Sequence, residues 1–263
     1  KSVKNTKQIT KAMELVAASK MRRAQDIAAL ARDYKKLAAQ ILTRLRELTN
    51  VDAHPLYRQR EVKIRLLIVV TSDRGLAGAY NSNVLRRLTA ELRKDEAEKI
   101  KSELIVVGKQ AATFVGKLDV TVIGVYKNFP ERPTANDIRP ILNTIRQKFE
   151  AGSLTSKEIS TRRKAIVRAQ EEGIELEELS LEGKIDAADI LFTDLKSSIT
   201  QEVKVEHILP AAFVETKVNK DLKHADFEPS PLLVLDQVTE RLIEVELHQA
   251  FFESQASEHS MRM

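Results

Sequence analysis

The stretch MELVAASKMRRAQDIAALARDYKKLAAQILTRLREL, residues 13–48, repeats small and apolar side chains in alternating steps of three and four. It lies within an opening segment of 54 residues that contains neither glycine nor proline. Such a repeat is typical of a coiled-coil seam, with one charged position at Lys20. A helix over residues 2–50 would be roughly 70 Å long, so much of it must project or pair with another helix. The seam positions are Met13, Ala17, Lys20, Ala24, Ile27, Ala31, Tyr34, Ala38, Ile41, Leu45 and Leu48.

A second repeat of the same kind follows the helix breaker Pro229-Ser230-Pro231 and continues toward Met263. Two such repeats at opposite ends of one chain favour an antiparallel pair of helices. Alanine at every seventh position would let the helices approach closely, while Ile27, Tyr34 and Ile41 fill the alternate layers. The alternative is two long helices in an ordinary bundle. The second seam consists of Leu235, Val238, Leu242, Val245, Gln249, Phe252 and Ala256.

Between the two repeats, short β-branched segments alternate with helical ones, which predicts a mostly parallel sheet covered by helices. The predicted fold class is α/β, with a small Rossmann-like domain held between the two arms of a coiled coil. Residues 155–184 are highly charged and are predicted to form a surface insertion, or alternatively a segment that holds a partner. The predicted domains are residues 1–54, 62–215 and 232–263. The predicted strands are 62–72, 104–107, 120–126 and 188–193, with 204–213 as an edge strand, and the predicted helices between them are 83–99, 110–118 and 134–151.

Composition limits the kinds of chemistry available to the chain. It is 43% hydrophobic and 31% charged, and no apolar run is long enough to span a bilayer, so any membrane association should be peripheral. There is no cysteine, which excludes disulfides and thiolate metal sites. The five histidines are scattered without the spacing of metal ligands. We therefore expect neither a metal nor a cofactor.

Positive charge is concentrated at the start of the chain. The formal net charge is +5, and Glu14 is the only acidic residue among the first 23. One interpretation is a solvated basic face. The other is contact with an acidic partner, whether protein, nucleic acid or phospholipid. The basic residues here are Lys1, Lys4, Lys7, Lys11, Lys20, Arg22 and Arg23.

The turn Gly75-Leu76-Ala77-Gly78-Ala79-Tyr80 is the one candidate for a phosphate-binding loop. A dinucleotide-binding loop needs glycine at the positions of Ala77 and Tyr80, and a phosphate loop of the Walker type needs a following Gly-Lys-Ser/Thr, which is absent. Gly75 and Gly78 are therefore predicted to shape a tight turn. Since no nucleophile or acid–base motif appears either, the chain is predicted to be non-enzymatic.

Three stretches carry a specific resemblance to a known family. Residues 1–23 (KSVKNTKQITKAMELVAASKMRR), 71–81 (TSDRGLAGAYN) and 253–263 (ESQASEHSMRM) resemble signature stretches of the gamma subunit of F-type ATP synthases, in the same order. The resemblance implies a non-catalytic central rotor shaft that couples rotation of the membrane c-ring to the three catalytic beta subunits. The implied partners are three alpha and three beta subunits, an epsilon-type subunit and the c-ring. Catalytic residues would belong to beta, with one arginine from alpha.

The resemblance also assigns an interface. Met13, Lys20, Met21, Arg22 and Arg23 fall in the motif that is expected to face the lever loops of the beta subunits, although several of them could face the second helix instead. The implied location is the cytoplasmic face of a bacterial plasma membrane, in preference to the matrix side of the mitochondrial inner membrane.

The sequence departs from the family pattern at three places. Ala77 and Ala79 replace the cysteine and glycine that are common there, residues 155–184 replace a short loop, and the last helix is expected to continue beyond Met263 because no cap ends it.

Two other functions fit parts of the sequence. A basic stretch followed by heptads is the outline of a DNA-binding leucine zipper, but this seam has alanine where a zipper has leucine. A nucleotide-dependent enzyme would use the Rossmann-like region, but its phosphate loop is missing.

Overall fold

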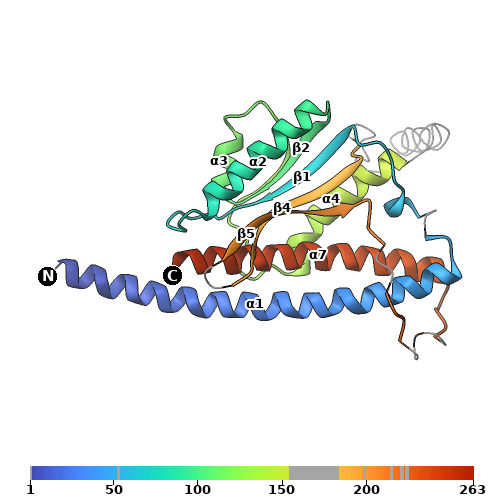
Figure 1. Cartoon of the computed structure of the whole chain (residues 1–263), viewed down its shortest axis with the longest axis horizontal. Helices are drawn as coiled ribbons and strands as arrows, with labels where there is room; N and C mark the ends of the chain where they lie inside the picture. Colours follow the sequence, from blue (N-terminus) through green and yellow to red (C-terminus); the bar gives the residue numbers. More distant parts are fainter. Residues whose placement is uncertain are drawn as a thin grey trace, which may run out of the picture.

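A five-stranded sheet with helices on both faces forms the body of the computed structural model, and two long terminal helices run along one side of it (Figure 1). The structure describes residues 2–51, 54–153, 184–197, 200–213, 216–219, 222 and 225–263. Almost all of the predicted insertion, residues 155–184, therefore lies outside the described residues. Helices α2 (Tyr80–Ala97) and α3 (Lys109–Val115) cover one face of the sheet, and α4 (Ala135–Ser153) and α7 (Pro231–Arg262) cover the other.

The sheet has the strand order β3-β2-β1-β4-β5. The first four strands are parallel to one another, whereas β5 is antiparallel to β4, which confirms the predicted mostly parallel sheet and its edge strand. β5 ends just before Pro210, whose nitrogen has no proton to donate to a ladder. The bounds are β1 Ile64–Val70, β2 Lys101–Val107, β3 Thr121–Tyr126, β4 Ala187–Leu195 and β5 Gln201–Leu209.

Alternation along β1 explains the two hydrophobic layers. Leu66, Ile68 and Val70 point toward α4 and α7, whereas Leu67 and Val69 point toward α2 and α3. All five are buried because β1 lies in the middle of the sheet, and this is why its sequence reads as a continuous apolar run.

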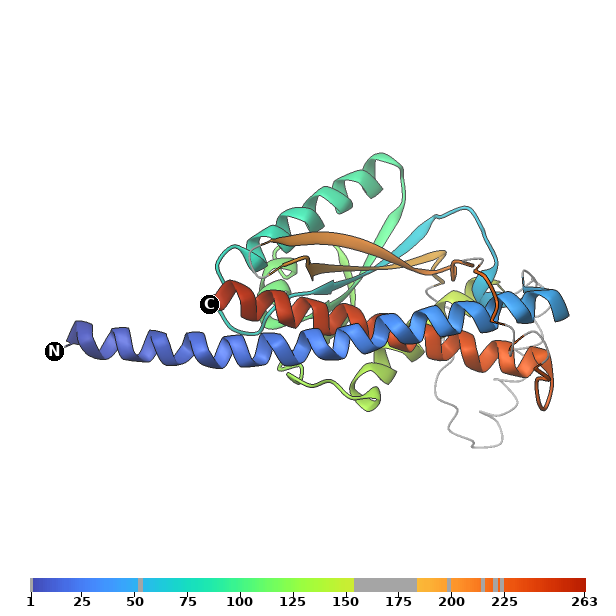
Figure 2. The same cartoon turned by 60° about the horizontal axis from the view of Figure 1, so that its bottom comes forward.

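The terminal helices α1 (Ser2–Leu48) and α7 lie side by side and run in opposite directions (Figures 1 and 2). The N-terminal part of α1 extends past the C-terminal end of α7 (Figure 2). A short 3₁₀ turn, η2 (Pro55–Tyr57), follows α1. The Ser230 hydroxyl caps the start of α7, where Pro231 is the first helical residue.

The buried face of α1 matches the predicted seam in one set of layers. Ala17, Ala24 and Ala38 are 5% exposed or less, and Ala31 is partly buried. In the alternate layers the fully buried side chains are Ala28 and Leu42, one residue later than the predicted Ile27 and Ile41, which are only partly buried.

Tyr34 lies at the rim of the helix contact: its side chain is 38% exposed and interacts with Arg241 of α7. Lys35 occupies the inner position in that layer, because its ammonium group contacts Glu206 and Glu246. Since Glu206 belongs to β5, α1 packs against the sheet edge as well as α7, and its buried face is turned accordingly.

The seam predicted on α7 is also incomplete. Leu235 is buried, but Val238, Leu242 and Val245 are only partly buried. The completely buried side chains recur every four residues and pack under the sheet, a second face that the heptad pattern did not include. They are Leu235, Thr239, Ile243 and Leu247.

The contact between α1 and α7 can be tested with two neighbouring alanines. Ala28 is 3% exposed and packs in one cluster with Phe252 and Ala256, whereas Ala29 faces solvent. We expect Ala28→Leu to lower the free energy of unfolding by about 1–3 kcal/mol, because a larger side chain must push the helices apart. Urea denaturation measures this. Ala29→Leu should change it by less than about 0.5 kcal/mol, and equal effects of the two substitutions would contradict the packing.

Candidate functional site at the exposed half of the first helix

The predicted interface residues on α1 separate into two groups. Met13 is 45% exposed, and the Arg22 and Arg23 side chains face solvent. Lys20 and Met21 are partly buried: the Lys20 ammonium group lies 2.5 Å from a carboxylate oxygen of Glu131, and Met21 packs against the cluster around Phe252. The structure therefore leaves Met13, Arg22 and Arg23 available to a partner and turns the other two inward.

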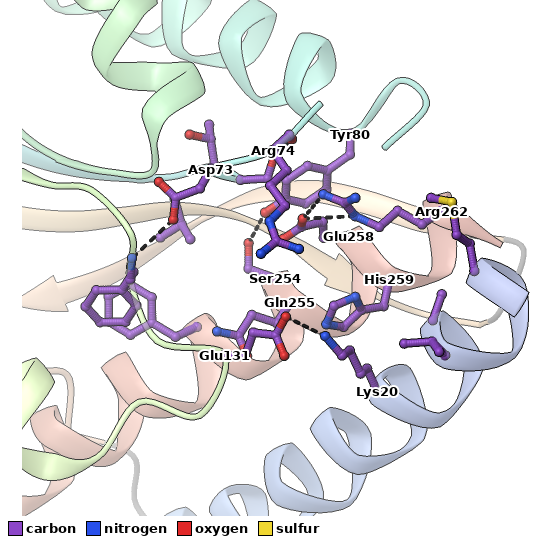
Figure 3. A pocket seen from close by; sticks show the side chains of 18 of the residues that line it. Lys20, Asp73, Arg74, Tyr80, Glu131, Ser254, Gln255, Glu258, His259 and Arg262 are labelled. Carbon is purple, nitrogen blue, oxygen red and sulfur yellow. Dashed lines mark hydrogen bonds and ion pairs between the residues drawn. The ribbon is translucent and has the colours of Figure 1, made fainter. Parts of the chain in front are cut away.

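A cavity of about 600 Å³ lies beside this part of α1 (Figure 3). Its floor includes Val70 and Val107, at the carboxyl ends of β1 and β2, where open α/β sheets commonly bind ligands. We call it the edge cavity. Its other walls come from α1, from the loops after β1 and β3, and from the last turns of α7. The polar side chains among its lining residues include Lys20, Asp73, Arg74, Glu131, Ser254, Gln255, Glu258, His259 and Arg262.

The edge cavity brings together the three stretches that carry the family resemblance. Lys20 comes from the first, Arg74 from the second, and Glu258 and His259 from the third (Figure 3). The sequence predicts contact with a partner subunit only for residues of the first stretch. The signal that could have found the others was the presence of all three stretches in one chain, although no sequence spacing shows that they meet.

Asp73 has a structural role at this site. Its carboxylate accepts hydrogen bonds from the backbone N–H groups of Lys109, Asn128 and Phe129, at 2.9–3.1 Å. These bonds tie together the loops after β1, β2 and β3. Because its oxygens are already engaged, Asp73 positions the loops around the cavity.

The turn after β1 does not have the geometry of a phosphate-binding loop. Ala77 is only 2% exposed, and Gly78 packs against Met261 of α7. Within this turn, the residues with a left-handed backbone are Leu76, at φ +60°, and Gly78, at φ +50°. Of the two predicted turn glycines, Gly78 adopts a conformation that favours glycine, whereas Gly75 does not.

Polar contacts fix the end of α7 against the loops. The Tyr80 hydroxyl lies 2.6 Å from the Ser254 hydroxyl, and both residues are buried. The Gln255 amide donates to the carbonyl of Pro130 at 2.9 Å. Burial raises the pKa of Tyr80, so its phenol stays protonated.

Glu131, Glu258 and His259 of the cavity have shifted pKa values. The hydrogen bond from Lys20 lowers the pKa of Glu131. Burial raises the pKa of Glu258, although Arg262 opposes this from 2.6 Å. Burial lowers the pKa of His259 to about 4, so the imidazole is neutral at pH 7. Among the described residues, no group of His, Asp and Glu could hold a metal ion, and none of their helices is long and apolar enough to cross a membrane.

Comparison with known proteins relates this arrangement to a family. The family model described as ATP synthase matches residues 1–263. The gamma chain of the Pelotomaculum thermopropionicum ATP synthase is 32% identical over 263 residues, which is all of this chain and 81% of the relative. The corresponding protein of Geotalea uraniireducens is 33% identical over 265 residues, covering all of this chain and 80% of the relative. The chain belongs to the ATP synthase gamma chain family. It is therefore a non-catalytic subunit of the rotor stalk.

A solved structure supports the fold of this gamma chain. A chain in the central stalk and c-ring structure of the Tetrahymena thermophila mitochondrial ATP synthase superposes with a TM-score of 0.62 at 20% identity. The match covers 97% of this chain and 96% of the other. A mixed α/β body with long terminal helices is thus an arrangement already seen in a central stalk.

The close approach of two loops beneath the cavity makes Gly108 a sensitive position. A Cβ atom there would lie 2.2 Å from the carbonyl oxygen of Thr71, at a backbone φ of +98°. We expect Gly108→Ala to destabilise the chain by roughly 3 kcal/mol or more, measured by thermal or urea unfolding. Gly75→Ala is the matched control, since nothing lies within 4 Å of its Cβ position. A Gly108→Ala variant as stable as the control would show that the loops are arranged differently.

The buried imidazole of His259 predicts a pH dependence. Its pKa is lower in the folded chain than the ordinary value of 6.5, so the unfolded chain binds the proton more readily. Stability from this group is present above about pH 6.5 and is lost as the pH falls toward about 4, by up to roughly 3 kcal/mol. As the pH is lowered from 7 to 4, the free energy of unfolding should fall less in His259→Gln than in the unmodified chain. Parallel curves would contradict the assignment.

Proposed function

We propose that this gamma chain turns as the central shaft of an F-type ATP synthase and transmits rotation of a membrane c-ring to the catalytic beta subunits. The observation that carries the proposal is α1 itself. It is an unbroken helix of 47 residues, about 70 Å long, whose N-terminal part extends past the rest of the structure (Figure 2). A helix that transmits torque needs an uninterrupted backbone ladder, and α1 contains no proline or glycine to interrupt it.

The pairing of α1 with α7 would make the shaft stiffer than one helix. We propose that the two helices form an asymmetric antiparallel coiled coil and that the sheet with its covering helices is a Rossmann-like domain at the foot of the stalk. In support, the order β3-β2-β1-β4 is also that of the first four strands of a dinucleotide-binding sheet. An asymmetric shaft would present a different face to each beta subunit as it turns, and would drive them in succession through their conformational states.

The proposed partners are three alpha and three beta subunits around the exposed half of α1, with an epsilon-type subunit and the c-ring at the foot. Contact with the membrane would occur only through the complex, on the cytoplasmic side of a bacterial plasma membrane. Neither DNA binding nor nucleotide-dependent catalysis is favoured by the relatives.

The exposed cations of α1 provide the proposed contact with the beta lever loops. Arg22 and Arg23 face solvent, and no ion-pair partner is found for either among the described residues. Long-range attraction between such cations and acidic loops depends weakly on orientation. A rotating shaft could therefore pass from one beta subunit to the next without being held at one position.

Reconstitution with alpha and beta subunits tests the proposed function. We expect one copy of this chain per ring, with ATP hydrolysis by the assembled ring. The variant Arg22→Gln/Arg23→Gln should bind the ring on the order of tenfold more weakly at low salt, with less difference at high salt. Arg86→Gln/Arg93→Gln is the matched control, because both side chains are exposed on α2, across the sheet from α7. Failure to recover a ring with a single copy would overturn the proposed function, and equal binding by the two double variants would overturn the interface.

A further inference from the structure

Three charged side chains from three elements meet where the terminal helices contact the sheet edge. Lys35 of α1 lies 3.0 Å from a carboxylate oxygen of Glu206 on β5 and 3.6 Å from one of Glu246 on α7. We call these residues the Lys35 cluster. Their side chains are only 20–27% exposed, so water screens their charges incompletely. Two carboxylates therefore share one ammonium group in a poorly hydrated contact.

Glu206 has a second cation, whereas Glu246 does not. The Lys204 ammonium group lies 3.1 Å from Glu206 and 3.6 Å from Asp194 of β4. No further ion pair to Glu246 is found among the described residues. The shorter distance to Lys35 also belongs to Glu206, so Glu246 is the less compensated of the two acids.

The other groups near Glu246 do not supply the missing charge. On α7 its neighbours one turn away include Leu242, Ile243 and Gln249, and the Gln249 amide donates to Glu253 instead. On β5 the imidazole of His207 is within electrostatic range, but its Nδ1 atom lies 2.6 Å from Asp189.

From η2, Tyr57 is also within electrostatic range of Glu246, but its hydroxyl lies 3.1 Å from the hydroxyl of Thr239. Glu246 is mostly buried and shares the Lys35 ammonium group with Glu206, so its carboxylate is incompletely neutralised and binding of a proton is favoured.

We propose that Glu246 is the centre of a proton-binding site, occupied near neutral pH, through which pH sets how firmly α1 and α7 are held together at the sheet edge. The proposal concerns the chain itself and does not depend on the proposed rotor function.

The direction of the effect follows from the two protonation states. With Glu246 neutral, Glu206 is paired with Lys35 and Lys204, and Asp194 is paired with Lys196 and Lys204. With Glu246 ionised, an additional negative charge faces Glu206 across a shared lysine. Burial raises the pKa of Glu246 to about 7, with Lys35 opposing the shift and Glu206 adding to it. Because the folded chain holds this proton more tightly than the unfolded chain, the stabilisation is lost as the pH rises through about 7.

The test compares the unmodified chain with Glu246→Gln, which mimics the protonated state at every pH. The unfolding equilibrium constant is measured by urea denaturation between pH 5.5 and 8.5. The unfolding equilibrium constant of the unmodified chain, divided by that of the variant, should rise on the order of 30-fold between pH 5.5 and pH 8.5, because the carboxyl titrates at 4.5 in the unfolded chain and at about 7 in the folded chain. Other titrating groups are present in both chains and cancel in the comparison.

Glu240→Gln is the matched control, because it makes the same change on the same helix at a side chain that is 40% exposed. Its stability relative to the unmodified chain should not follow the pH dependence seen with Glu246→Gln. A constant difference between Glu246→Gln and the unmodified chain across this pH range would overturn the proposal.

A second measurement uses the unmodified chain and therefore tests the proposal even if Glu246→Gln fails to fold. Nuclear magnetic resonance of the side-chain carboxyl carbons in the unmodified chain should show that the resonance assigned to Glu246 titrates near pH 7. Glu206→Gln should move this titration to lower pH, because Lys35 then serves Glu246 alone. If every glutamate carboxyl of the unmodified chain titrates below pH 6, the site does not exist.

Discussion

The double burial of α7 is the constraint on which the rest of the structure depends. One face of this helix packs under the sheet through Leu235, Ile243 and Leu247, and another meets α1 at Phe252 and Ala256. Full burial of a large apolar side chain contributes roughly 1.5–3 kcal/mol, so these contacts connect the long helix pair firmly to the sheet. The pair and the sheet thus share a hydrophobic core, and a twist applied to one is passed to the other.

The contact between α1 and α7 consists mostly of small apolar residues, but it also contains charged groups. Arg32 of α1 donates to Glu253 of α7 at 2.8 Å, and the Glu253 side chain is only 3% exposed. The Arg32 side chain is 54% exposed, so the pair adds little net stability, but removal of Arg32 would leave the buried Glu253 carboxylate unpaired, which is costly. Together with the Lys35 cluster, this pair holds α1 in one register against α7. Alanines alone would set that register weakly.

Much of the fold could be predicted from the pattern of residues, and the misses have a common cause. The glycine-free opening segment predicted α1, and the apolar runs predicted all five strands, because both signals are local. The inner position of Lys35 beside Tyr34 was missed because a pattern of hydrophobicity ranks a lysine below a tyrosine, whereas Lys35 is held inside by acids that are distant in the sequence. The second buried face of α7 was missed for a similar reason, since a heptad describes one partner and α7 has two. The meeting of Lys20, Arg74 and His259 around one cavity likewise depends on tertiary structure, and the functional assignment came from the family resemblance.

Direct observation of rotation tests the central claim, that this chain is a shaft which carries torque and performs no chemistry. The chain has no cysteine, so Lys94→Cys on the exposed side of α2 provides a single attachment point for an optical probe. In a reconstituted alpha–beta ring that is fixed to a surface, the probe should rotate in one direction during ATP hydrolysis, with pauses that match the number of catalytic subunits. Steady ATP hydrolysis with a stationary probe on a correctly assembled ring would contradict the account.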